Sequence, residues 1–180
     1  MKPIIDKLHN DHINFIKLLG FLENQLLQLK EYKPIDLDSM LDAIRYMKEY
    51  PDLVHHPLEN VIFNYFLEHH DEVQSELKTL LHEHDELPGL TDKLLEMLQC
   101  ALAGEPQKRE ELYQYLKEYI TVQKEHMNSE ESLVYPTISS VLKKNDWRNI
   151  NSELALVEDP LFGDRVKKSY QELLQNIIQN

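Results

Sequence analysis

Histidine and glutamate recur along this chain at matched intervals. The interval from His12 to His84 is repeated, to within one position, from His55 to His126 and from Glu59 to Glu130. The chain thus carries two copies of one pattern, a lone histidine followed much later by a His-x-x-x-Glu pair. Residues four apart on an α-helix differ by only about 40° around its axis, so each pair presents both side chains on one face. Imidazole nitrogens with carboxylate oxygens suit iron, manganese or zinc. The candidate metal ligands are His12, His55, Glu59, His84, His126 and Glu130.

The elements that must position these residues are helices. Apolar residues at helical spacing predict helices over residues 3–30, from a cap at Asp38 or Ser39 to about 67, over about 72–103 with a kink at Pro88-Gly89, and over about 107–143. Each helix places one of the four histidines within its apolar stripe. The predicted fold is all-α, an antiparallel up-down four-helix bundle over residues 1–145. Residues 146–180 are predicted to form a helical C-terminal tail packed on the bundle, with its last helix at about 165–178.

A proline interrupts the second predicted helix beside the first His-x-x-x-Glu pair. Pro57 follows His55 and His56 directly, and an interior proline costs a helix about 3 kcal/mol. We expect this proline to bend the helix and to aim His55 and Glu59 toward the bundle axis.

Composition narrows the classes of function. The chain is 42% hydrophobic and 28% charged, and its net charge of −13 argues against a nucleic-acid partner and against an anionic membrane surface. Cys100 is the only cysteine, so a cysteine metal cluster is excluded. Charges near the N-terminus interrupt any secretory apolar segment. A cytoplasmic setting is expected.

The same residues also have simpler interpretations. A single buried histidine is usually a hydrogen-bonded core residue, and a His/Glu pair at i, i+4 is often a surface pair that contributes ~0.3–0.5 kcal/mol. One matched set spread over four helices favours a metal site instead. The other histidines lack this support: His56, rotated by about 100° from His55, is expected to flank the site.

Two longer segments resemble a known family. "DLVHHPLEN" and "KEHMNSEESLVYP" resemble the H-H-P-x-E and H-x-x-x-E-E-x-x-L-F-P segments of the hemerythrin-like HHE cation-binding domains, and "HNDH" and "LLHEHDEL" resemble the lone-histidine helices of that family. The resemblance covers about residues 4–142. It implies a non-haem di-iron centre held by the same six residues. Oxygen binding, redox or iron sensing, and roles in nitric-oxide stress occur among such proteins.

The chain departs from the family pattern in several places. Oxygen carriers have a histidine four residues before the third-helix ligand, where this chain has Leu80, so we expect an open coordination position on the metal nearest His84. Carriers use a carboxylate at the position of Glu131, whereas helical geometry favours Glu130. Asn60 replaces a second glutamate, and Tyr135 stands where the pattern has phenylalanine.

Three functions follow as hypotheses. The first is a protein with two iron ions that binds or senses dioxygen, redox state or iron; manganese and zinc suit the same donors. The second is a di-iron enzyme that acts on peroxide or nitric oxide, and the third is a metal-free helical interaction module. The expected partner is a small molecule such as dioxygen, peroxide or nitric oxide, and a homodimer stays open.

Overall fold

The computed structural model describes residues 3–105, 108–152, 159–163 and 168–179, and these residues are mostly helical. The elements are α1 (Pro3–Lys30), α2 (Leu37–Tyr50), η1 (Pro51–His55), α3 (His56–His69), α4 (Gln74–Leu102), α5 (Arg109–Ser129), η2 (Glu130–Val134), α6 (Tyr135–Val141), α7 (Lys144–Asn151), η3 (Lys168–Tyr170) and α8 (Gln171–Gln179). The predicted all-α class is confirmed. None of the helices in the described ranges is both long enough and apolar enough for a membrane span.

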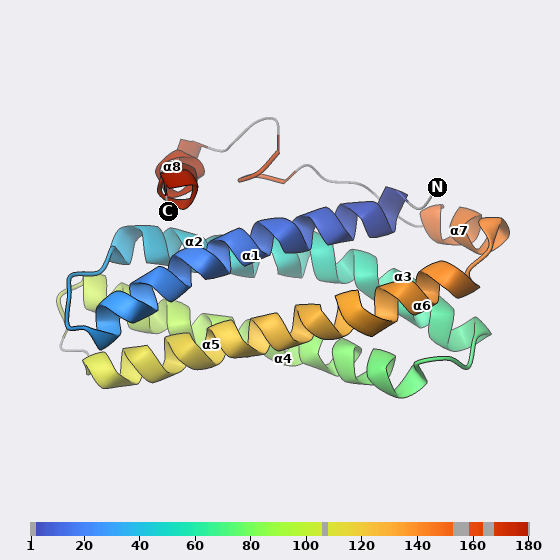
Figure 1. Ribbon diagram of the computed structural model, residues 1–180, viewed down its shortest axis with the longest axis horizontal. Coiled ribbons are helices and arrows are strands. Elements are labelled where there is room, and N and C mark those ends of the chain that lie inside the picture. The colour runs from blue at the N-terminus through green and yellow to red at the C-terminus, as the bar shows by residue number, and fades with distance from the viewer. Residues whose placement is uncertain (1–2, 106–107, 153–158, 164–167, 180) are drawn as a thin grey trace.

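Four long rods make up most of the molecule. They are α1, the run α2–η1–α3, α4, and the run α5–η2–α6, and successive rods run in opposite directions along the long axis (Figure 1). α1 packs against α2 and α5, and α4 packs against α2, α3 and α5. The buried apolar residues form two clusters, one built mainly on α1, α2, α4 and α5 and the other on the start of α1, on α3 and on α6. The six candidate donors lie between these clusters, and we call the region that they occupy the polar layer.

Several helix ends differ from the prediction. α2 is capped by Asp36, whose carboxylate accepts a hydrogen bond from the Ser39 backbone N–H at 3.0 Å, rather than by Asp38 or Ser39. α4 begins after Val73, which has a left-handed φ of 47°, and continues through Pro88. The fourth rod ends at Val141, before the predicted 143, because Leu142 is extended.

Two π-helical turns interrupt the rods beside the polar layer. In η1 the His56 N–H bonds to the Pro51 carbonyl, and in η2 the Tyr135 N–H bonds to the Glu130 carbonyl, so both bonds span five residues. A proline follows each turn, Pro57 after η1 and Pro136 after η2, at the second position of the next helix. Proline has no backbone N–H to donate, and the wider hydrogen-bond spacing of the π-helical turn accommodates this missing donor. Pro57 therefore stands in the first turn of α3, directly after a π-helical turn.

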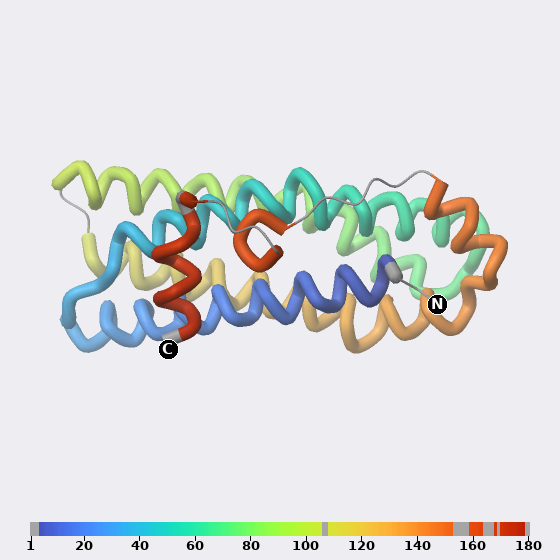
Figure 2. Tube along the Cα trace, turned by 90° about the horizontal axis from the view of Figure 1, so that it is seen from above, coloured from blue at the N-terminus to red at the C-terminus, as the bar shows by residue number. Residues whose placement is uncertain are grey.

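The C-terminal residues lie across the rods. α7 packs against α3, and α8 crosses over α1 and α2 (Figure 2). The buried Asp159 accepts a hydrogen bond from the Tyr46 hydroxyl at 2.8 Å and two more from the backbone N–H groups of Leu161 and Phe162. The predicted last helix is seen as η3 and α8, and its first residues, up to 167, lie outside the described residues. The division at residue 145 stays a prediction.

The Tyr46–Asp159 bond predicts a stability effect far from the polar layer. Tyr46 is fully buried, so Tyr46→Phe leaves one oxygen of a buried carboxylate without its donor. We expect the free energy of unfolding to fall by about 1–3 kcal/mol in urea titrations followed by circular dichroism. Tyr32→Phe is the control, because Tyr32 is 82% exposed and should change nothing. Equal stability of the two variants would contradict this account.

Candidate metal centre

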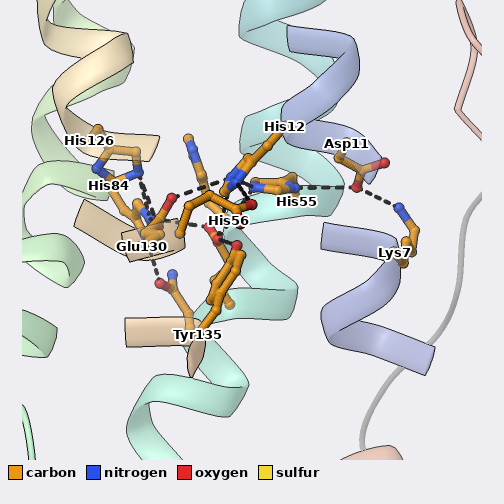
Figure 3. Close-up of polar contacts among 12 residues, drawn as sticks. Lys7, Asp11, His12, His55, His56, His84, His126, Glu130 and Tyr135 are labelled. Atoms are coloured by element: carbon orange, nitrogen blue, oxygen red, sulfur yellow. Dashed lines mark hydrogen bonds and ion pairs between the residues drawn. The ribbon is translucent and has the colours of Figure 1, made fainter. Parts of the chain in front are cut away.

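The structure brings all six sequence-predicted residues together in the polar layer. His12 lies on α1, His55 ends η1, Glu59 lies on α3, His84 on α4, His126 on α5, and Glu130 begins η2. None of the six is more than 6% exposed, and both glutamates are fully buried. Figure 3 shows the imidazoles of four different rods directed toward one another. The layer can hold a metal. Donor atoms of His12, His55 and Glu59 lie within 4.8 Å of one another, and so do those of Glu59, His84, His126 and the adjacent His56.

The four histidines form two pairs. The Nε2 atoms of His12 and His55 are 2.9 Å apart, and those of His84 and His126 are 3.2 Å apart. We call these pairs the first and the second half-site. Two nitrogens bound at right angles to one ion, each at about 2.1 Å, lie about 3.0 Å from each other. Each half-site therefore has the spacing of two ligands on one ion, and in the metal-free protein the same spacing lets the two rings share a proton.

Both glutamates connect the half-sites. Glu59 directs Oε1 to His55 Nε2 and Oε2 to His84 Nε2, both at 3.3 Å. Glu130 directs Oε2 to His12 Nε2 and Oε1 to His126 Nε2, also at 3.3 Å. Glu59 Oε2 and both Glu130 oxygens have no hydrogen-bond partner among the described residues.

Buried carboxylates without compensation are costly, by several kcal/mol each. The unpartnered oxygens and the spacing of the nitrogens thus fit bound metal cations as the compensating charge.

The outer nitrogens of the four rings are also bonded. Each Nδ1 meets an oxygen of a residue outside the set: His12 with Glu131 at 2.8 Å, His55 with Asp11 at 3.2 Å, His84 with Asn60 at 2.7 Å, and His126 with Glu83 at 2.7 Å. An Nδ1–H that donates outward leaves the Nε2 lone pair directed inward. This arrangement fixes ring orientation and tautomer in protein metal sites.

These four acceptors recur along the sequence at the same spacing as the six candidate metal ligands. The residue before each lone histidine, Asp11 or Glu83, bonds to the histidine of the His-x-x-x-Glu pair. The residue after each pair, Asn60 or Glu131, bonds to the lone histidine. Sequence reasoning did not identify this layer of acceptors. The signal was present, because each acceptor adjoins a donor and so recurs at the same interval as that donor.

Adjacent glutamates on η2 have different surroundings. Glu130 faces the centre, whereas Glu131 bonds outward to His12 Nδ1 and to His9 Nδ1, at 2.8 and 2.9 Å. The Glu131 side chain is 31% exposed. The geometry therefore favours Glu130 as the inward donor.

His56 lies closer to the centre than a flanking residue. Its ring stacks on that of His84 at 4.3 Å, and it belongs with Glu59, His84 and His126 to one group of possible donors. Burial lowers the pKa of His56 well below its usual range, so the ring is a neutral donor. Leu80 instead belongs to an apolar cluster. A third imidazole thus stands beside the second half-site, and it comes from α3 rather than from position 80 of α4.

Tyr135 contacts the first half-site. Its hydroxyl donates a hydrogen bond to Glu59 Oε1, and its ring stacks on that of His12 at 5.5 Å with an angle of 7°. Burial and the charges of Glu59 and Glu130 raise the pKa of Tyr135, so the hydroxyl stays a donor.

On the far side of His55, Asp11 also accepts a hydrogen bond from Lys7 at 2.7 Å (Figure 3).

In the metal-free protein, protons supply part of the positive charge that the carboxylates require. Burial alone would lower the pKa of His12, but Glu130 and Glu131 raise it to about 10. Burial likewise disfavours the charged form of His84, yet Glu130 and Glu59 raise its pKa to about 9.

These shifts predict how the stability of the metal-free protein depends on pH. Histidines of the unfolded chain titrate near 6.5, so raised pKa values in the fold stabilise it fully below that pH, and the stabilisation is lost as pH rises toward 10. We expect the melting temperature of the chelator-treated protein to fall between about pH 7 and pH 10. With zinc bound the fall should be smaller, because neutral imidazoles are the ligands. A flat profile for the metal-free protein would refute the electrostatic account.

Most of the chain matches a known protein family. No curated protein matches the chain at a significant level. A family model described as the hemerythrin HHE cation binding domain matches residues 3–138, which include all six donors and all four acceptors. The chain belongs to the hemerythrin HHE cation-binding domain family.

Proposed function

We propose that this protein is a non-haem di-iron protein that binds or senses a small molecule such as dioxygen, or responds to redox state or iron. The observation that carries the proposal is that Glu59 and Glu130 each direct one oxygen to each half-site. The four rods would form an antiparallel up-down bundle around the ion pair. Iron would supply reversible one-electron chemistry and affinity for small ligands, while manganese and zinc suit the same donors.

The two half-sites offer unequal numbers of protein donors. The second half-site has three imidazoles when His56 is included, and the first has two. Both share Glu59 and Glu130. We therefore assign the open position to the first half-site, not to the ion nearest His84 as the sequence suggested.

A cavity supports this assignment. A volume of about 480 Å³ between α1 and α5 borders His12, with Ile16 and Met127 on its apolar wall. Its lining also includes Lys124, Glu125, Asn128 and Glu131, so the cavity gives small molecules, neutral or charged, an approach to the first half-site. With a net charge of −13 we expect neither nucleic acid nor a membrane as partner. The single cysteine and the charges near the N-terminus favour a cytoplasmic setting. A homodimer stays open.

Metal analysis tests the proposal. Protein purified under reducing conditions with iron supplied should contain about two irons per chain, with near-ultraviolet absorption from the carboxylate-bridged pair. His126→Ala and Glu130→Ala should each remove most of that iron. His82→Ala is the control, because the His82 side chain is 70% exposed and pairs with Glu86. Iron content unaffected by the first two variants would favour the metal-free interaction module.

An enzymatic function is the second candidate, favoured by the Tyr135 hydroxyl beside the half-site with fewer donors. An enzyme should consume many equivalents of peroxide per iron pair, whereas a binding protein should be oxidised once and stop. Stopped-flow spectroscopy of the reduced protein distinguishes these outcomes. We expect one stoichiometric oxidation. Sustained consumption of peroxide would show instead that the protein is an enzyme.

A further inference from the structure

The internal repeat places two aromatic rings in equivalent positions. Tyr135 stacks on His12 at 5.5 Å with an angle of 7°, and Phe63 stacks on His84 at 6.0 Å with an angle of 17°. The interval from Phe63 to Tyr135 equals the interval between the two histidines that they cover. Each ring is almost fully buried. Each half-site is therefore covered by one aromatic ring from the same position of the repeat, and of these two rings only Tyr135 carries a hydroxyl group.

That hydroxyl lies where a bound molecule would meet it. It donates to Glu59 Oε1, the oxygen that lies 3.3 Å from His55 Nε2 and 3.9 Å from His12 Nε2. A molecule on the ion of the first half-site would be a neighbour of this oxygen, since adjacent ligands of one ion are about 3 Å apart. Because this phenol is only 3% exposed to solvent, it donates its hydrogen bond to the carboxylate or to that molecule with little competition from water.

We propose that Tyr135 determines which small molecules bind at the first half-site, by donating a hydrogen bond to those that can accept one. This inference rests on the proposed function. The favoured class is small anions with a basic terminal atom, because a hydrogen bond to a charged acceptor is stronger than one to a neutral acceptor. Nitric oxide, a neutral and weakly basic molecule, gains little from the phenol. Phe63 gives the second half-site no such preference.

The test compares two probes on the reduced, iron-loaded protein. Tyr135→Phe should raise the dissociation constant of azide about tenfold and change that of nitric oxide less than about twofold. The iron content should be unchanged, because phenylalanine already fills the equivalent position at residue 63. Equal weakening of both probes, loss of iron, or unchanged azide binding would each overturn the inference.

Phe63→Tyr is the matched control. It places the same hydroxyl on the second half-site, so azide binding should match that of the unmodified protein. A gain in azide affinity would show that any nearby phenol suffices and would overturn the specific role of Tyr135.

A metal-free measurement completes the test. Tyr135→Phe should lower the melting temperature of the chelator-treated protein, because Glu59 loses its hydroxyl donor; an unchanged value would contradict the hydrogen bond itself. Absence of iron from the unmodified protein overturns both this inference and the proposed function. Iron in place with unchanged azide binding overturns this inference alone.

Discussion

Two fully buried carboxylates, Glu59 and Glu130, impose the constraint on which the rest of the polar layer depends. Apolar clusters close the layer on both sides, so water cannot solvate these charges. Four inward Nε2 atoms surround them, and each ring is held from behind by an acceptor. Without metal, protons on His12 and His84 supply positive charge. With metal, cations would replace those protons, so metal binding, proton release and folding stability are linked.

The internal repeat holds at the level of donors rather than of backbone. η1 ends at His55, before its glutamate, whereas η2 begins at Glu130 itself. Each π-helical turn adds a residue at a different place in its repeat. The interval between the aromatic residues, Phe63 and Tyr135, is consequently one position longer than the interval between the glutamates that precede them. The turns therefore let two unequal backbones present nearly equivalent side chains to one centre.

Periodicity and spacing predicted the helices and the six inward residues, because both depend on the position of a residue within its own helix. The acceptors and His56 depend on something else, namely how each helix is rotated relative to its neighbours. His56 is about 100° from His55 on an ideal helix, so the sequence predicted that it flanks the site. The π-helical turn that precedes it and the packing of α3 against α4 bring its ring onto His84 instead. The cap at Asp36 was missed for a local reason, since Asp36, Asp38 and Ser39 are all good capping residues.

The C-terminal residues lie beyond the family match, yet contacts connect them to a candidate ligand. Asp159 holds the Tyr46 hydroxyl, and the Tyr46 ring stacks on Tyr50 at 5.6 Å. The Tyr50 hydroxyl in turn donates to Asp11 at 3.3 Å, and Asp11 bonds to His55 Nδ1. Because the rings of Phe162 and Tyr170 pack edge-on against Tyr46, removing them would expose one side of the Tyr46–Tyr50 pair next to Asp11. Water reaching Asp11 would weaken its bond to His55, so the orientation of one donor depends on residues outside the metal-binding motifs.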